Sequence, residues 1–381
     1  MIYFDNASST PPSSSVIKVM HDALNTYYAN PSSLHTLGIQ ARKRMNQAKR
    51  NIASMLNVDR QSIIFTSSGT EANNLALKGV YYANRGGDVI TSTIEHHSVS
   101  YTTAFLETLG VKVHYIPVDT RGYLDLAILE ETLKKHHVAL VSIIYANNEV
   151  GTVQDIDTIR KLTKSHGALL HLDMVQVPLH KHIDLTALGC DLASFSAHKF
   201  FGPRGAGLLY KKPGVEIIPQ MHGGQHEFKL RAGTENLVGI IGMETALKET
   251  IENLDVRENK TNHLAHHLLR KLNESGLDYR LNGPSLNQPR LLATLNIGFK
   301  DQDAQVLSFA LNQRNIFVTL GSACDSESIE PSHVLRAMNV PNDYIKGSMR
   351  FSIAETMQEK DIEYTVDVLK SIIRSEVALI E

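Results

Sequence analysis

Apolar segments that resemble strands alternate with amphipathic segments that resemble helices along the middle of the chain. The strand candidates are residues 88–94, 112–118 and 138–146, and leucines recur at helical spacing over residues 126–133. This alternation predicts an α/β fold with a mainly parallel central sheet covered by helices. In such a sheet, ligands bind at the carboxyl ends of the strands.

A second domain is indicated further along the chain. After residue 242 the sequence becomes helical and charged, and residues 291–299 resemble another strand. We therefore expect the large domain to cover residues 15–250 and a smaller α+β domain to cover residues 251–381.

Composition favours a soluble globular enzyme. The 381 residues include 38 basic and 40 acidic side chains, giving a formal charge of -2, so no nucleic-acid-binding surface is indicated. No apolar run approaches the ~20 residues needed to cross a bilayer, and a recognisable motif begins too early for a signal peptide. With 2 Cys, no disulfide framework is expected. The expected location is the cytoplasm.

The most informative motif is the segment 194–199, where Lys199 follows an apolar strand candidate. A lysine that forms an imine with an aldehyde cofactor must lose its proton, and its pKa falls readily on burial or near positive charge. Ser196 and His198 are suited to hold a phosphate of that cofactor. Such a short motif taken alone is more often an ordinary loop, so the interpretation depends on the residues upstream.

Asp173 follows an apolar run that resembles a strand, which places it at the strand's carboxyl end. A carboxylate there suits a pyridinium nitrogen, because its negative charge favours the protonated ring that lets pyridoxal phosphate act as an electron sink. Gln176 is placed to donate to the ring oxygen. An aspartate that caps a turn is the alternative. Because Lys199 lies downstream, a cofactor contact is favoured over a turn cap for Asp173.

A phosphate cradle is predicted where the strand candidate 62–65 runs into residues 66–71, which include Gly69 and Thr70. Glycine permits a tight turn, the first N–H groups of the following helix are free, and the helix dipole favours an anion. No Gly-Lys-Ser/Thr follows, and residues 202–207 have the wrong glycine order for a dinucleotide site. One phosphate-bearing cofactor therefore explains more residues than a nucleotide.

From residues 4–10 to residues 349–352, the chain resembles the NifS/IscS-type cysteine desulfurases, which are fold-type I pyridoxal-phosphate enzymes of the class V aminotransferase family. By this resemblance residues 1–14 join the small domain, which then comprises 1–14 plus 251–381. The other matching blocks are residues 30–38, 95–97, 147–152, 230–236 and 321–324.

The resemblance implies a site for pyridoxal 5'-phosphate in which Lys199 forms the Schiff base and Asp173 pairs with the ring nitrogen. His96 is expected to stack on the ring, with His97 as the alternative. The other implied cofactor contacts are Gln176 at the ring oxygen, Gly69, Thr70, Ser196 and His198 at the phosphate, and Thr234 from the neighbouring subunit of a homodimer.

The resemblance also implies the reaction. Asn148 and Arg350 are expected to receive the carboxylate of L-cysteine, for which a guanidinium is geometrically suited. Lys199 moves protons, and the Cys324 thiolate attacks the substrate sulfur and keeps it as a persulfide while L-alanine leaves. Family members pass the sulfur to an acceptor protein for iron–sulfur clusters, tRNA thiolation or cofactor biosynthesis. The expected catalytic residues are thus Lys199, Cys324 and His96.

Two places depart from the family pattern. Residues 352–357 replace a Gly-Arg-Phe-Thr run that commonly follows the arginine, which puts the local backbone and any partner contact there in doubt. Asp325 stands where Ser or Thr is commoner, and a carboxylate beside the Cys324 thiolate opposes its formation unless the carboxylate faces solvent. We therefore expect slower turnover than is typical of the family.

Two other functions stay open. One is a different pyridoxal-phosphate enzyme on this scaffold, a selenocysteine lyase or an aminotransferase, for which Cys324 is dispensable. The other is a weakly active scaffold within a protein complex, suggested by Asp325 and residues 352–357. Any tRNA role is expected to run through a protein acceptor, because the near-neutral charge disfavours direct tRNA binding.

The remaining histidines and the second cysteine are expected to be structural. Three histidines within residues 263–267 share one side of a helix candidate, but the glutamate of an H-E-x-x-H site is missing, so a solvated helix face is predicted. His136 and His137 are interpreted in the same way, and no metal site is predicted. Cys190 is expected to pack as a small buried side chain.

Overall fold

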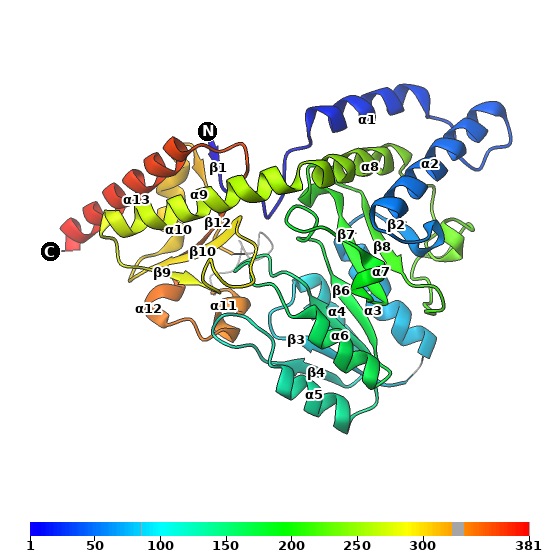
Figure 1. The fold of residues 1–381 in the computed structure, drawn as a ribbon, viewed down its shortest axis with the longest axis horizontal. Coiled ribbons are helices and arrows are strands. Elements are labelled where there is room, and N and C mark those ends of the chain that lie inside the picture. Colours follow the sequence, from blue (N-terminus) through cyan, green and yellow to red (C-terminus); the bar gives the residue numbers. More distant parts are fainter. Residues whose placement is uncertain (85, 322–330, 381) are drawn as a thin grey trace.

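A seven-stranded sheet, with strand order β2-β8-β7-β6-β5-β3-β4, lies at the centre of the larger part of this computed structural model, which describes residues 1–84, 86–321 and 331–380 (Figure 1). The five strands from β7 to β4 run parallel, whereas β8 is antiparallel to β7 and β2. The predicted α/β fold with a mainly parallel sheet is confirmed. The strands are β2 Ile63–Thr66, β3 Asp88–Ser92, β4 Val113–Ile116, β5 Val138–Ile144, β6 Leu169–Asp173, β7 Leu192–Ser196 and β8 Gly207–Lys211.

Both faces of this sheet are covered by helices. Successive side chains of a strand point to opposite faces, and accordingly Ile63 and Phe65 join one apolar core while Ile64 joins another. Helices α3 and α4 pack on the Ile64 side, and α2, α5, α6 and α8 contribute to the other core. The helices of this part are α1 Ser14–Thr26, α2 Thr36–Met55, α3 Gly69–Asn84, α4 His97–Thr108, α5 Leu126–Lys135, α6 Ile156–Ser165, α7 Leu185–Leu188 and α8 Leu237–Glu252.

A smaller part contains a three-stranded antiparallel sheet with strand order β12-β10-β9. Figure 1 shows α9, in yellow-green, extending toward it from the larger part, and both chain ends lie on its side of the molecule. Its elements are α9 Leu254–Ser275, β9 Tyr279–Asn282, β10 Thr294–Phe299, α10 Ala304–Asn312, β11 Ile316–Phe317, α11 His333–Ala337, α12 Asn342–Ile345, β12 Ser348–Ser352 and α13 Glu359–Ile380.

The first residues of the chain pack against this smaller part. Strand β1, Ile2–Tyr3, pairs in parallel with β11, and Phe4 is fully buried in the core that residues of α9, β10, α10 and β12 form. The phenyl ring of Phe4 meets that of Phe351 edge to face, with 5.4 Å between ring centres. The expected boundaries of the two domains stay a prediction.

The segment after Arg350 has its own local partners. Glu355 Oε1 lies 3.1 Å from Arg257 Nε, and the buried Arg257 guanidinium lies 5.1 Å from the ring centre of Phe201. The acidic residue that departs from the family pattern therefore pairs with a cation of α9.

The expectation of a solvated histidine face on α9 is wrong for one of its three residues. His263 and His266 are exposed, but His267 is only 3% exposed because α13 packs against α9. Its Nε2 lies 3.3 Å from Glu363 Oε1. The histidine spacing alone gives no sign of this helix pairing.

Two other expectations concern burial and apolarity. Cys190 has no exposed surface, and burial raises the pKa of its thiol to about 12, so its predicted structural role is supported by its position. Among the helices of the described residues, none combines the length and the apolarity that a membrane span requires.

Candidate active site

A cavity of about 220 Å³ lies beyond the carboxyl ends of β6 and β7, where the amino end of α3 also meets it. This is the position expected for a ligand site in a parallel sheet. The cavity brings together most of the residues that the sequence singled out. Its lining includes Gly69, Thr70, His96, Asn148, Asp173, Gln176, Ser196, His198, Lys199 and Arg350.

Lys199 lies in a short 3-10 helix, Ala197–Lys199, that directly follows β7. Its Nζ donates to the backbone oxygens of Ala7, at 2.7 Å, and Ser8, at 2.8 Å. Gln176 Nε2 donates to the same Ala7 oxygen at 2.9 Å. The N-terminal segment therefore holds the lysine amine in the cavity, a contact that the sequence analysis missed.

Asp173 is the last residue of β6 and is 3% exposed, which confirms its predicted place at the carboxyl end of a strand. Its carboxylate accepts from Asn73 Nδ2 at 2.7 Å and from the backbone N–H of Val175 at 3.0 Å. Burial raises the pKa of Asp173, while these two hydrogen bonds and the positive charge of Lys199 oppose the rise. A cationic ring nitrogen beside it would stabilise the carboxylate further.

Another part of the cavity lining, which includes Gly69 and His198, fits an anion. A Cβ built on Gly69 would lie 2.6 Å from Val175 Cγ2, so the close approach there requires glycine. Gly69 is the first residue of α3, whose free N–H groups and dipole attract negative charge. Burial, and then the charges of Lys199 and Arg204, lower the pKa of His198 to about 4, so the imidazole is neutral at pH 7.

Arg350, in the middle of β12, is 1% exposed. Its Nη2 contacts Asp5 Oδ1 at 3.0 Å and Ser8 Oγ at 2.5 Å, and its Nη1 donates to the backbone oxygen of Asn148 at 2.9 Å. Its buried Nε has no hydrogen-bond partner among the described residues. A buried guanidinium with an unused donor at a cavity wall is suited to a carboxylate ligand.

His96 caps the amino end of α4, because its Nδ1 accepts from the backbone N–H of Ser98 at 3.1 Å. Ser98 Oγ lies 2.8 Å from that Nδ1 and also accepts from Asn73 Nδ2 at 2.8 Å. His96 lines the cavity, whereas His97 stacks on Tyr101 with 4.6 Å between ring centres. A hydrogen-bonded chain thus connects the ring predicted to stack on the cofactor with Asp173. Asn73 and Ser98 were missed, although Asn73 lies one helical turn after Gly69.

Glu95 is buried beside this network and its pKa is raised to about 8, chiefly by burial. Its Oε1 accepts from the backbone N–H of Ile144 at 3.0 Å, but its Oε2 has no hydrogen-bond partner among the described residues. In the unfolded chain this carboxyl ionises at about pH 4.3. Between that pH and about 8, the unfolded chain has therefore lost a proton that the folded chain keeps.

From this follows a prediction about stability. Between about pH 4.5 and 8, Glu95 should lower the free energy of unfolding by about 1.4 kcal/mol for each unit by which the pH rises. Glu95→Gln, which mimics the protonated form, should abolish that contribution. The free energy of unfolding of the variant should therefore increase relative to that of the natural chain as the pH rises. Urea unfolding of both proteins at several pH values measures the difference. If the difference in free energy of unfolding between the two proteins does not change with pH, Glu95 is ionised in the folded chain over this whole pH range.

Two expected site residues are not in the cavity lining: Thr234 lies apart from the cavity, and Cys324 lies outside the residues that the structure describes. Thr234 lines a separate cavity of about 120 Å³ together with Ser67 and Arg231. Its expected contact involves the phosphate of a neighbouring subunit, and this stays a prediction. Cys324 and Asp325 lie outside the residues that the structure describes.

The cavity combines a half-buried lysine with a buried aspartate at the carboxyl ends of two parallel strands, and this combination is typical of one class of protein. The sequence model of the Aminotransferase class-V family matches residues 2–365, and the chain belongs to this family. A relative named "Cysteine desulfurase IscS", from Dictyoglomus turgidum, is 40% identical over 374 residues, which are 98% of this chain and 94% of the relative. The expected family is thereby confirmed.

Two solved structures agree with this membership. A "NIFS-LIKE PROTEIN" has a TM-score of 0.90 and 34% identity, and the match covers 98% of this chain and 99% of that one. A structure titled "SspA in complex with cysteine" has a TM-score of 0.80 and 30% identity over 93% of this chain and 99% of that one.

Proposed function

We propose that this enzyme is a pyridoxal-phosphate-dependent cysteine desulfurase, which converts L-cysteine to L-alanine and transfers the sulfur through Cys324. The observation that supports it most is a single cavity lined by Lys199, Asp173 and Arg350. These residues supply an amine, a buried carboxylate and a buried guanidinium, as a cofactor-bound amino acid requires. The cysteine desulfurases among its relatives favour cysteine over other amino acids as the substrate.

The residues of the cavity fit the cofactor group by group. Asp173 is placed to pair with a protonated ring nitrogen, Gln176 with the ring oxygen, and His96 with the ring face. Pyridoxal phosphate supplies an electron sink when it is bound. The phosphate is assigned to Gly69, Thr70, Ser196 and His198, with Thr234 contributed by a second copy of the chain.

The remaining residues act on the substrate. Arg350, with its unused Nε donor, and Asn148 orient the carboxylate of cysteine. Lys199, after releasing the oxygens of Ala7 and Ser8, moves protons to and from the substrate carbon.

Sulfur transfer is assigned to Cys324. Its thiolate attacks the sulfur of the substrate, so that an S–S bond forms as the C–S bond breaks. The carbon keeps the electron pair of the broken bond and takes up a proton, and alanine leaves. The persulfide on Cys324 then passes its outer sulfur to the thiol of an acceptor protein, which regenerates the Cys324 thiolate.

The homodimer, the cytoplasmic location and the identity of the acceptor stay predictions. The dimer has a direct check, because it requires Thr234 of one copy to complete the phosphate site of the other. Thr234→Ala should bind the cofactor more weakly, and mixing it with the inactive Lys199→Ala should form some complete sites and raise the activity above that of Thr234→Ala alone if the subunits exchange.

The function is tested on the purified protein by recording its visible absorption spectrum and then adding L-cysteine. We expect a cofactor band, and alanine together with an equal amount of sulfide when a thiol reductant is present. Selenocysteine and a 2-oxo acid, supplied in parallel, test for a lyase and an aminotransferase. A cofactor band without alanine formation would favour the scaffold interpretation, and the absence of a band would overturn the proposal.

A further inference from the structure

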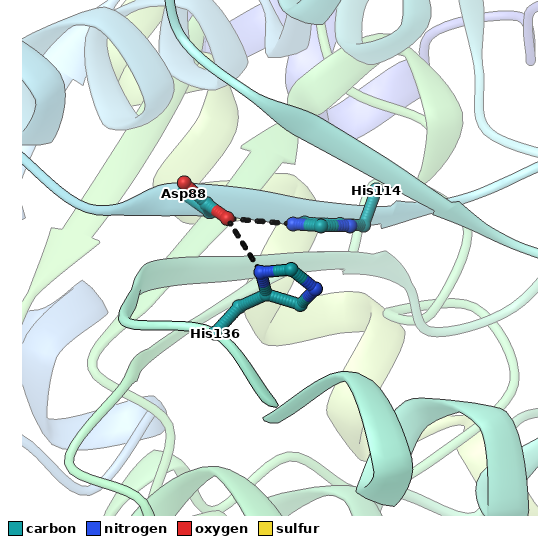
Figure 2. A group of neighbouring side chains, drawn as sticks. All are labelled: Asp88, His114 and His136. Atoms are coloured by element: carbon teal, nitrogen blue, oxygen red, sulfur yellow. Dashed lines mark hydrogen bonds and ion pairs between the residues drawn. The ribbon is translucent and has the colours of Figure 1, made fainter. Parts of the chain in front are cut away.

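Asp88, His114 and His136 form a cluster of side chains at the end of the large sheet opposite the cavity (Figure 2). His114 Nε2 lies 2.7 Å from Asp88 Oδ2, and His136 Nδ1 lies 3.4 Å from the same oxygen. The two imidazole rings are 4.3 Å apart between their centres. Each residue therefore turns one potential metal-ligand atom toward the same point.

Three elements converge to make this cluster. Asp88 is the first residue of β3, His114 lies near the start of β4, and His136 caps the end of α5. The backbone N–H of Asp88 donates to the oxygen of His137 at 2.7 Å, which brings the end of α5 to the start of β3. Because β3 and β4 are parallel neighbours, with Val89 opposite Val113, Asp88 and His114 lie on adjacent strands.

The position separates this cluster from the proposed catalytic machinery. Strand β3 begins at Asp88, and the chain reaches the cavity at His96 only after this strand has ended. Strand β4 is the edge strand of the sheet. A group bound here is therefore placed to affect the attachment of the edge strand rather than the reaction.

We propose that Asp88, His114 and His136 bind a zinc ion. Two imidazoles and one carboxylate are typical zinc ligands, and tetrahedral bonds of about 2.0–2.2 Å place neighbouring ligand atoms about 3.4 Å apart. The three ligand atoms lie within 4.8 Å of one another, so small side-chain movements suffice. The side chains are 22%, 15% and 30% exposed, which leaves room for water as the fourth ligand.

The charges around the cluster do not all favour a cation. Lys112 and Lys135 add positive charge near His136, which weakens the binding of a metal ion.

A second cluster, formed by His267, Glu359 and Glu363, provides a matched control. There Arg270 Nη2 lies 2.6 Å from His267 Nδ1, and Lys271 Nζ lies 3.9 Å from Glu363 Oε1. The two cationic side chains already compensate the carboxylates, and one imidazole nitrogen faces a guanidinium. We therefore expect no zinc there.

The test is equilibrium dialysis of the full-length, tag-free protein against zinc chloride, with bound zinc measured by mass spectrometry. A Cys324→Ser background removes one competing thiolate. We expect one zinc per chain, and a dissociation constant raised at least about 100-fold by His114→Ala or His136→Ala, because even residues that only orient metal ligands are worth 10–100-fold. His267→Ala should bind zinc as the background protein does.

Two further measurements guard against misfolding and adventitious binding. The isosteric Asp88→Asn should weaken zinc binding in the Cys324→Ser background, and in the natural chain it should leave circular dichroism and cysteine turnover unchanged. X-ray absorption of the zinc-loaded protein should show nitrogen and oxygen ligands at about 2.0–2.1 Å, with the scattering of two imidazoles. Equal zinc binding by His114→Ala, His136→Ala and the background protein, or no binding at all, would overturn the proposal.

Discussion

Replacing Lys199 with alanine should reduce alanine formation from cysteine by about 10⁴-fold or more and remove the visible absorption of the lysine-bound cofactor. Lys199 supplies the one lysine amine among the described residues that line the cavity. The oxygens of Ala7 and Ser8 hold that amine in the cavity that Asp173 also lines, and its positive charge opposes the rise that burial causes in the pKa of Asp173. No neighbouring group in that lining offers a replacement amine.

Two variants separate this loss from a general disturbance. Lys199→Arg keeps the positive charge but stays protonated, so it should be as inactive as the alanine variant. Lys211→Ala removes another partly buried lysine, which donates to the backbone oxygen of Val215 at 2.9 Å away from the cavity, and it should stay active. Turnover above one tenth of the natural rate in Lys199→Ala would exclude the assigned role.

Replacing Cys324 with alanine should lower desulfuration by about 10³-fold or more while the cofactor spectrum is retained. The proposed step needs a thiolate that accepts the substrate sulfur, and a methyl group cannot do this. Alanine and sulfide release measure the loss. Mass spectrometry of the natural protein after a single turnover should show the mass of one added sulfur on the peptide that contains Cys324.

Cys190→Ala is the matched control, because it removes the other cysteine of the chain. Its buried thiol has a pKa of about 12, so almost no thiolate is present at neutral pH. Activity should therefore persist, at a small cost in stability. Undiminished alanine formation by Cys324→Ala would instead favour a lyase that releases sulfur without a protein thiol.

Local sequence patterns predicted the frame of the site well. The alternating strand and helix candidates correspond to β3, β4 and β5 with the helices between them. Asp173 ends one apolar strand and Lys199 follows the next, and parallel neighbouring strands bring their carboxyl ends together. The phosphate cradle at Gly69 could also be predicted, because the glycine and the following helix are adjacent in sequence.

Contacts between segments that are distant in the sequence could not be predicted from local patterns. The oxygens of Ala7 and Ser8 hold Lys199 from more than 190 positions away, and backbone acceptors leave no trace in residue type. His267 is buried by α13, and His136 meets Asp88 through the packing of α5 against the sheet edge. Periodicity reports which side of a helix is apolar, but not which helix will cover it.

The placement of the first residues also constrains the order in which the chain matures. Phe4 donates its N–H to Phe317 and accepts from Ser352, 348 positions later. During synthesis, the ribosome must therefore have released most of the chain before Ala7 and Ser8 can be locked beside Lys199. Nascent chains should contain a formed large sheet well before they contain a competent lysine, so stable cofactor capture is expected to be a late, post-synthetic event.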